Sequence, residues 1–155
     1  MNDLVFRTAS SGDLPTVLAL LAALDSAGEA PMELAEAQQR FARISSYPDY
    51  AIWLVERHGA VAGTYSLLIM DNLGHRGAPE AIVENVVVAD GQRGTGIGSA
   101  MMRHAMAQAA QRGCYKLVLS SNEARTEAHR FYDGLGFERH GISFRVAPTA
   151  VAAHP

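Results

Sequence analysis

The chain has 155 residues, of which 48% are hydrophobic and 19% charged, and its formal net charge is −3. This length favours one domain with a sizeable core, and the composition excludes a disordered chain. Thirteen basic against sixteen acidic residues argue against a nucleic-acid-binding protein, which would concentrate basic charge on one face. A single cysteine excludes a disulfide framework. Without an apolar run of membrane-spanning length or a signal peptide, the sequence predicts a cytoplasmic protein without a membrane anchor.

The first half of the chain predicts a strand, two helices and a pair of strands. Hydrophobic residues alternate at 4–8, whereas they follow helical spacing from Leu14 to Leu24. His58 and Gly59 separate two runs rich in β-branched and aromatic residues, which is typical of a hairpin turn. The predicted elements are a strand at 4–8, helices at 14–27 and 32–44, and strands at 50–57 and 61–70.

The second half predicts alternating strands and helices. The β-branched run at 81–88 is typical of a central strand buried on both faces. The elements that follow it are a helix at 98–112, a strand at 116–120, a helix at 123–135 and a last strand at 142–146. The order β-α-α-β-β-β-α-β-α-β predicts an α/β single domain over 1–146 with a mixed sheet. Residues 147–155 are rich in Ala and predict a flexible tail.

A glycine-rich loop between the central strand and the next helix carries the strongest chemical signal. It reads Gln-Arg-Gly-Thr-Gly-Ile-Gly-Ser over residues 92–99. Glycines there permit positive φ and let a ligand approach the backbone. Successive N–H groups at a helix N-terminus favour an anion, and Arg93 adds a cation. The loop therefore predicts a phosphate or pyrophosphate cradle.

Three other interpretations of this loop are possible. A P-loop requires a lysine, which the loop lacks. A dinucleotide fingerprint would place its third glycine at Ser99, and no acidic residue ends the following strand, which argues against a nicotinamide-nucleotide-binding domain. A plain tight turn is the remaining alternative.

The residues around the loop make a more specific pattern. Glu84-Asn85-Val86-Val87-Val88 precedes it, and Arg93-Gly94-Thr95-Gly96-Ile97-Gly98 fits the spacing Arg-x-x-Gly-x-Gly. Asn122 and the run Ala-His-Arg-Phe-Tyr-Asp-Gly-Leu-Gly-Phe at 128–137 follow. In this order, over 82–137, the chain resembles the GNAT superfamily of acyl-CoA-dependent N-acetyltransferases. The resemblance implies a GNAT-like fold in which the strand at 86–88 splays away from the strand at 116–120.

The resemblance also implies a role for individual residues. Acetyl-CoA would be the co-substrate: the loop would hold its pyrophosphate, and its pantetheine arm would lie in the opening between the splayed strands. The implied acetyl-CoA-binding residues are Val86, Val87, Val88, Arg93, Gly94, Thr95, Gly96, Ile97, Gly98, Ser99, Asn122 and Phe131. Core packing is the alternative for Phe131, since aromatic side chains in a helix commonly serve the core.

Two residues are the candidates for proton transfer. An amine must lose a proton to attack a thioester, which a carboxylate can accept, and the departing thiolate can take a proton from a phenol. Glu84 is the candidate base and Tyr132 the candidate acid. A solvated strand-end carboxylate and a structural tyrosine are their respective alternatives. The six histidines show no metal-ligand spacing, so we expect no metal site.

Together these observations predict an enzyme that moves acetyl from acetyl-CoA to a primary amine. We expect a small-molecule acceptor, such as an amino acid, a polyamine or an amine-bearing antimetabolite, in preference to a protein terminus, and a net charge of −3 would tolerate a cationic amine. The alternative is a catalytically silent CoA-binding sensor or regulatory module. The resemblance also implies a homodimer.

Overall fold

A five-stranded mixed sheet is the centre of the computed structural model, which describes residues 3–25 and 28–148. The strands lie side by side in chain order; the first four are antiparallel to their neighbours, and the last is parallel to the fourth. Their bounds are β1 (Leu4–Thr8), β2 (Tyr50–Arg57), β3 (Ala60–Met70), β4 (Glu80–Val88) and β5 (Lys116–Val118). This mixed α/β architecture confirms the expected fold class.

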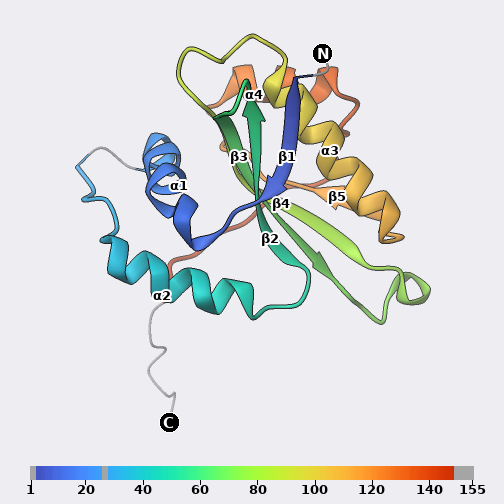
Figure 1. Ribbon diagram of the computed structural model, residues 1–155. Coiled ribbons are helices and arrows are strands. Elements are labelled where there is room, and N and C mark those ends of the chain that lie inside the picture. The colour runs from blue at the N-terminus through green and yellow to red at the C-terminus, as the bar shows by residue number, and fades with distance from the viewer. Residues whose placement is uncertain (1–2, 26–27, 149–155) are drawn as a thin grey trace. The chain divides into compact units, whose positions relative to one another are not determined.

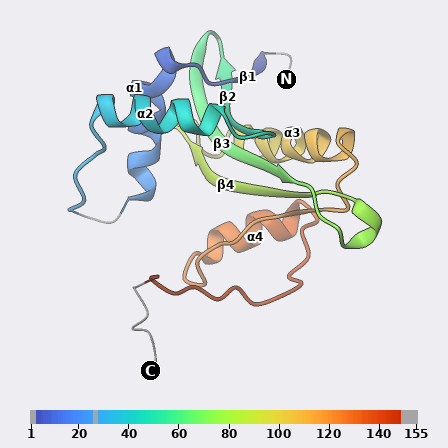
Figure 2. The same cartoon turned by 90° about the horizontal axis from the view of Figure 1, so that it is seen from below.

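The described residues form four α-helices, and the chain divides into two compact units, 1–119 and 120–155. The first unit contains the sheet, α1 (Leu14–Leu21), α2 (Leu34–Ser45) and α3 (Ile97–Gln111). Figure 1 shows α1 and α2 on one side of the strands and α3 on the other. The turned view in Figure 2 again places α2 beside β2 and α3 beside β4. The second unit contains α4 (Thr126–Gly134). No helix of the described residues is both long and apolar enough to span a bilayer.

The core of the first unit lies between α3 and the sheet. The face of α3 that packs on the sheet is fully buried at Met101, Met102 and Ala105, as the helical spacing predicts. The strands approach each other closely at Gly63, where an added Cβ would lie 2.8 Å from the Val87 carbonyl oxygen. Only glycine therefore fits between β4 and α3 at this position.

A half-buried histidine, His104, lies in the same layer. The Tyr65 hydroxyl lies 2.6 Å from His104 Nδ1, and the Phe6 ring stacks on the imidazole at 4.2 Å between centroids. Burial lowers the pKa of His104 and raises that of Tyr65, because both charged forms lose hydration. Burial therefore favours the neutral form of His104 over its cation.

The hairpin between β2 and β3 forms as the sequence predicts. His58 and Gly59 have φ values of 51° and 77°, the positive pair that a two-residue turn of type I′ requires. This conformation joins Arg57 and Ala60 as neighbours in the antiparallel register.

Several predicted boundaries differ from the structure. The last predicted strand, 142–146, has no strand partner among the described residues, and its apolar side chains Ile142, Phe144 and Val146 are 82%, 90% and 85% exposed. Alternation produced this prediction, but a strand also needs a neighbour to accept its hydrogen bonds. The prediction that β4 is buried on both faces is wrong in its middle, because Glu84 and Asn85 are exposed.

The elements around β5 are also shorter than predicted. The strand ends at Val118 instead of residue 120, where its pairing with β4 stops. Helix α4 begins at Thr126 instead of residue 123 because Asn122 makes a turn first: its side-chain oxygen accepts from the Ala124 N–H at 2.9 Å. Of the predicted tail, residues 149–155 lie outside the described part of the chain, whereas 147 and 148 have no regular structure.

Candidate active site

The glycine-rich loop leads directly into the N-terminus of α3. Gly94 and Gly96 have φ values of 74° and 86°, so each occupies the left-handed region that L-residues rarely adopt. Gly96 is the N-cap of α3, and a Cβ built on either glycine would meet open space. Glycine is therefore required here by backbone conformation, and the exposed backbone leaves room for a ligand.

The loop presents unused hydrogen-bond donors. Within the described residues, the N–H groups from Gly94 to Ser99 have no backbone acceptor, whereas Ala100 already donates to the Gly96 carbonyl at 3.0 Å. The first N–H groups of a 15-residue helix carry partial positive charge from the macrodipole. Arg93 is exposed beside them, 3.4 Å from Asp90. This arrangement suits an anion with several oxygens, such as a pyrophosphate.

The strand that precedes the loop separates from its parallel neighbour. Strand β4 pairs with β5 only at its first residues, ending with Ile82 opposite Val118, and then continues to Val88. A bulge at Asn85, whose φ is 55°, shifts the register between β4 and β3. Residues 86–88 thus extend beyond β5 with one edge free of strand pairing in the first unit. An extended ligand with amide groups could pair with this edge.

Glu84 lies next to the bulge. It is exposed and stands opposite the buried Ser66 in the antiparallel register. Because Ser66 alternates with Tyr65, which points toward α3, Glu84 faces the other side of the sheet, where α1 and α2 lie. An exposed carboxylate can exchange protons with water, which a general base needs.

Tyr132 belongs to the second unit, on α4. Its ring contacts Phe131 and Phe137 edge to face, with centroids 5.1 Å and 5.6 Å away. Burial raises the pKa of its phenol, opposed in part by the positive charge of Arg125. The phenol therefore keeps its proton at neutral pH, as a general acid must. The packing of Phe131 against Tyr132 also fits the core alternative for Phe131.

Asn122 already has local partners. Its side-chain oxygen accepts from Ala124, and its carbonyl oxygen lies 2.9 Å from His129 Nε2. The side-chain NH₂ group is the part of Asn122 left to donate to a ligand. Among the described residues, no group of three or more His, Cys, Asp or Glu side chains could hold a metal ion.

Two features of the site were missed at the sequence level. The first is the bulge at Asn85, although asparagine is among the residues that tolerate the left-handed region. The second is Arg57, whose guanidinium reaches the glycine-rich loop with Nη1 3.3 Å from Gln92 Oε1 and Nη2 3.4 Å from the Thr95 carbonyl oxygen. Arg57 and Gln92 are 35 positions apart, so no local sequence pattern could predict their contact.

Comparison with known proteins agrees with this geometry. The sequence model described as the acetyltransferase (GNAT) family matches residues 19–137. The chain belongs to this family, whose members take an acetyl group from acetyl-CoA, and it is an N-acetyltransferase by class.

Individual proteins are similar to this chain in sequence or structure. Glucosamine 6-phosphate N-acetyltransferase of Trypanosoma brucei brucei is 28% identical over 93% of this chain and 95% of its own. Aminoalkylphosphonate N-acetyltransferase of Salmonella typhimurium is 35% identical over 64% of each chain. A solved structure from Agrobacterium tumefaciens, provisionally described as an acetyltransferase, superposes with a TM-score of 0.87 at 32% identity, covering 93% of this chain and 99% of that one.

Proposed function

We propose that the chain transfers the acetyl group of acetyl-CoA to the primary amine of a small molecule. The observation that carries this proposal is the run of unpaired N–H groups from Gly94 to Ser99, beside the unpaired edge of β4. The loop would bind the pyrophosphate, and residues 86–88 would pair with the amide-containing arm that ends in the thioester.

Two side chains would move the protons. Glu84 accepts a proton from the acceptor's ammonium group, so that the neutral nitrogen can attack the thioester carbonyl carbon. The new N–C bond forms as the C–S bond breaks, and the Tyr132 hydroxyl supplies a proton to the departing thiolate. The nitrogen then loses its second proton, which restores the Tyr132 phenol, and Glu84 releases its proton to water. The exposure of Glu84 and the raised pKa of Tyr132 are consistent with these roles.

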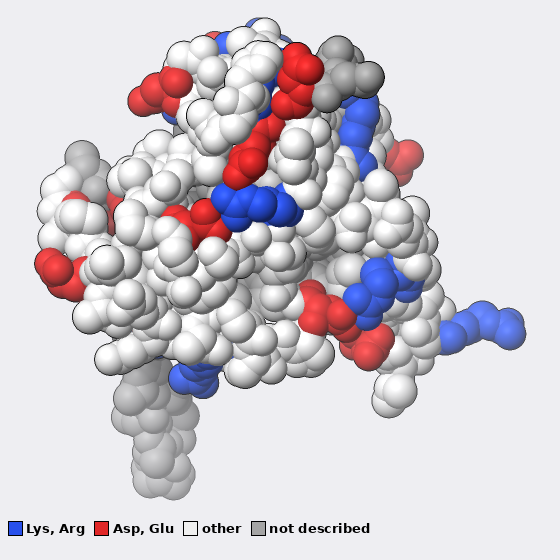
Figure 3. Space-filling view, viewed as in Figure 1, with Lys and Arg blue, Asp and Glu red and all other residues white. Residues whose placement is uncertain are grey.

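The names of two relatives support a class of acceptor. Two of them are named for amines that also carry a phosphate or phosphonate group. We therefore propose small amines that carry a phosphate or phosphonate group as acceptors, in addition to amino acids and polyamines. On the face drawn in Figure 3, acidic and basic side chains of the described residues are interspersed, which gives no extended basic surface for a nucleic acid. A homodimer and a cytoplasmic location are further parts of the proposal.

The test is CoA release from acetyl-CoA across a panel of amines. The panel contains amino sugar phosphates, aminoalkylphosphonates, amino acids, polyamines, aminoglycosides and short peptides. Tyr132→Phe should lower kcat about a hundredfold, the lower end of a general acid's contribution, and leave the KM for acetyl-CoA nearly unchanged. Tyr47→Phe, at an exposed tyrosine that accepts from Arg43, is the matched control and should keep full activity.

Two outcomes would contradict the proposal. Tight acetyl-CoA binding without turnover on any amine would indicate the silent CoA-binding module. An active enzyme whose Tyr132→Phe variant matches the control would remove Tyr132 from the mechanism.

A further inference from the structure

Arg57 connects the β2–β3 hairpin to the glycine-rich loop. It is the last residue of β2 and lies immediately before the turn at His58 and Gly59. Its guanidinium donates to Gln92 at 3.3 Å and to the Thr95 carbonyl oxygen at 3.4 Å. One side chain therefore holds the loop at two points, on either side of Arg93 and Gly94.

The contact at Thr95 determines which way the next N–H group points. In a planar trans peptide, the C=O of one residue and the N–H of the following residue point in opposite directions. Because Arg57 holds the Thr95 carbonyl from the hairpin side, the Gly96 N–H is directed away from the hairpin. A cation on the carbonyl oxygen also polarises the peptide group and strengthens its N–H as a donor.

Two other hydrogen bonds of the loop do not involve the Thr95–Gly96 peptide group. The Thr95 hydroxyl donates to the Gln92 carbonyl at 2.6 Å, and the Ala89 N–H donates to the Ala62 carbonyl at 2.9 Å. The bond from Thr95 lies within the loop, and the bond from Ala89 holds the start of the loop to β3. The Arg57 contact thus connects the tip of the loop to the hairpin.

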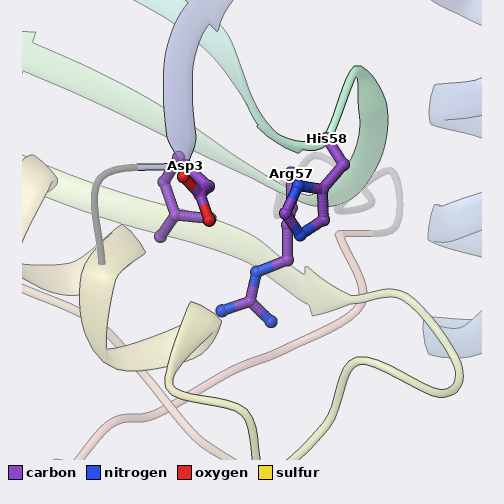
Figure 4. Close-up of a pocket in the computed structure, with 4 residues that line it drawn as sticks. Asp3, Arg57 and His58 are labelled. Carbon is purple, nitrogen blue, oxygen red and sulfur yellow. The ribbon is translucent and has the colours of Figure 1, made fainter.

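The surroundings of Arg57 argue against direct ligand binding by this side chain. A hollow of about 240 Å³ beside it is lined by Asp3, Leu4, Arg57 and His58. Figure 4 shows the Arg57 side chain extending from the hairpin with its guanidinium away from the backbone, and Asp3 on the neighbouring strand end. The carboxylate of Asp3 makes this hollow a poor site for a phosphate group.

We infer that Arg57 is a positioning residue for the acetyl donor: it orients the Thr95–Gly96 peptide so that the Gly96 N–H can bind the pyrophosphate. This inference rests on the proposed acetyl-CoA-binding function. It assigns a role to a residue that contacts the loop and not the ligand.

The test measures binding of CoA and of 3′-dephospho-CoA by isothermal titration calorimetry. Arg57→Ala should weaken the binding of both ligands by about tenfold, because both carry the pyrophosphate and the two hydrogen bonds from Arg57 to the loop are lost. The control is Arg112→Ala, which removes an exposed ion pair with Asp49 and should leave both affinities unchanged. Melting temperatures of the two variants, measured alongside, should lie within about 2 °C of each other, so that a loss of binding is not a loss of folding.

Three other results would overturn the inference, and each has a different meaning. If the wild-type protein binds neither ligand, the proposed function fails, and the inference fails with it. If the wild type binds and Arg57→Ala binds equally well, only the inference fails. If the loss is present for CoA and absent for 3′-dephospho-CoA, Arg57 contacts the 3′-phosphate directly and does not act through the loop.

Discussion

Replacing Gly63 by alanine probes the close packing that holds β3 against β4 beside the proposed donor site. The added Cβ would lie 2.8 Å from both Met101 Sδ and the Val87 carbonyl oxygen, and 3.2 Å from Val55 Cγ1. These distances are roughly 0.5 Å or more below ordinary van der Waals separations. The Met101 side chain can rotate away, but the Val87 carbonyl belongs to the backbone of a paired strand. The clash must therefore displace β4.

Overpacking of this kind lowers the free energy of unfolding by about 1–3 kcal/mol. For a chain of this length, each kcal/mol lowers Tm by about 2–4 °C, so Gly63→Ala should melt roughly 2–12 °C below wild type. Calorimetry or circular dichroism would measure the shift. Gly12→Ala is the matched control, because its nearest neighbour, the Ser10 hydroxyl oxygen, lies 3.8 Å from the added Cβ. A Gly63→Ala protein that melts with wild type, or a control that loses as much, would refute the packing argument.

Three further changes have defined outcomes. Burial lowers the pKa of His104 below 6.5, so the unfolded chain binds a proton more readily than the folded chain does. The free energy of unfolding should therefore decline as the pH falls below about 6.5. In urea titrations at pH 7.5 and 5.5, the His104→Gln variant should show a smaller decline than wild type. Equal slopes for both proteins would contradict this. Asp13→Ala removes both contacts with Arg7, at 2.7 and 2.8 Å, and should lower the free energy of unfolding by about 1 kcal/mol, whereas an unchanged Tm would show the pair to be neutral. Gly96→Ala and Gly113→Ala both place alanine at positive φ, and each should lower the free energy of unfolding by about 1–2 kcal/mol. Only Gly96→Ala should also raise the KM for acetyl-CoA. An equal increase in KM for Gly113→Ala would contradict the assignment of the loop as the pyrophosphate site.

Local signals predicted much of the fold. The strand at Leu4–Thr8 and the turn at His58 and Gly59 form where alternation and turn chemistry place them. The glycine-rich loop leads into α3 within one residue of the predicted start. These features depend on neighbours in sequence, so a single sequence contains the information that determines them.

Features that depend on distant partners could not be predicted in the same way. Residues 142–146 alternate like a strand, yet alternation does not supply an edge to pair with. The contact from Arg57 to Thr95 joins residues 38 positions apart. The bulge at Asn85 interrupts a run of strand-forming residues, and its effect on register appears only when β4 is paired with β3.

The central claim is that the amides from Gly94 to Ser99 bind the pyrophosphate of acetyl-CoA. The most direct measurement is a ¹⁵N–¹H NMR titration of the labelled protein with acetyl-CoA, because it reports each amide separately and needs no knowledge of the acceptor. We expect saturable shifts concentrated at residues 94–99 and 86–88, with little change at Gly113 at the opposite end of α3. Binding that leaves the amides of 94–99 unshifted, or no binding at all, would contradict the account.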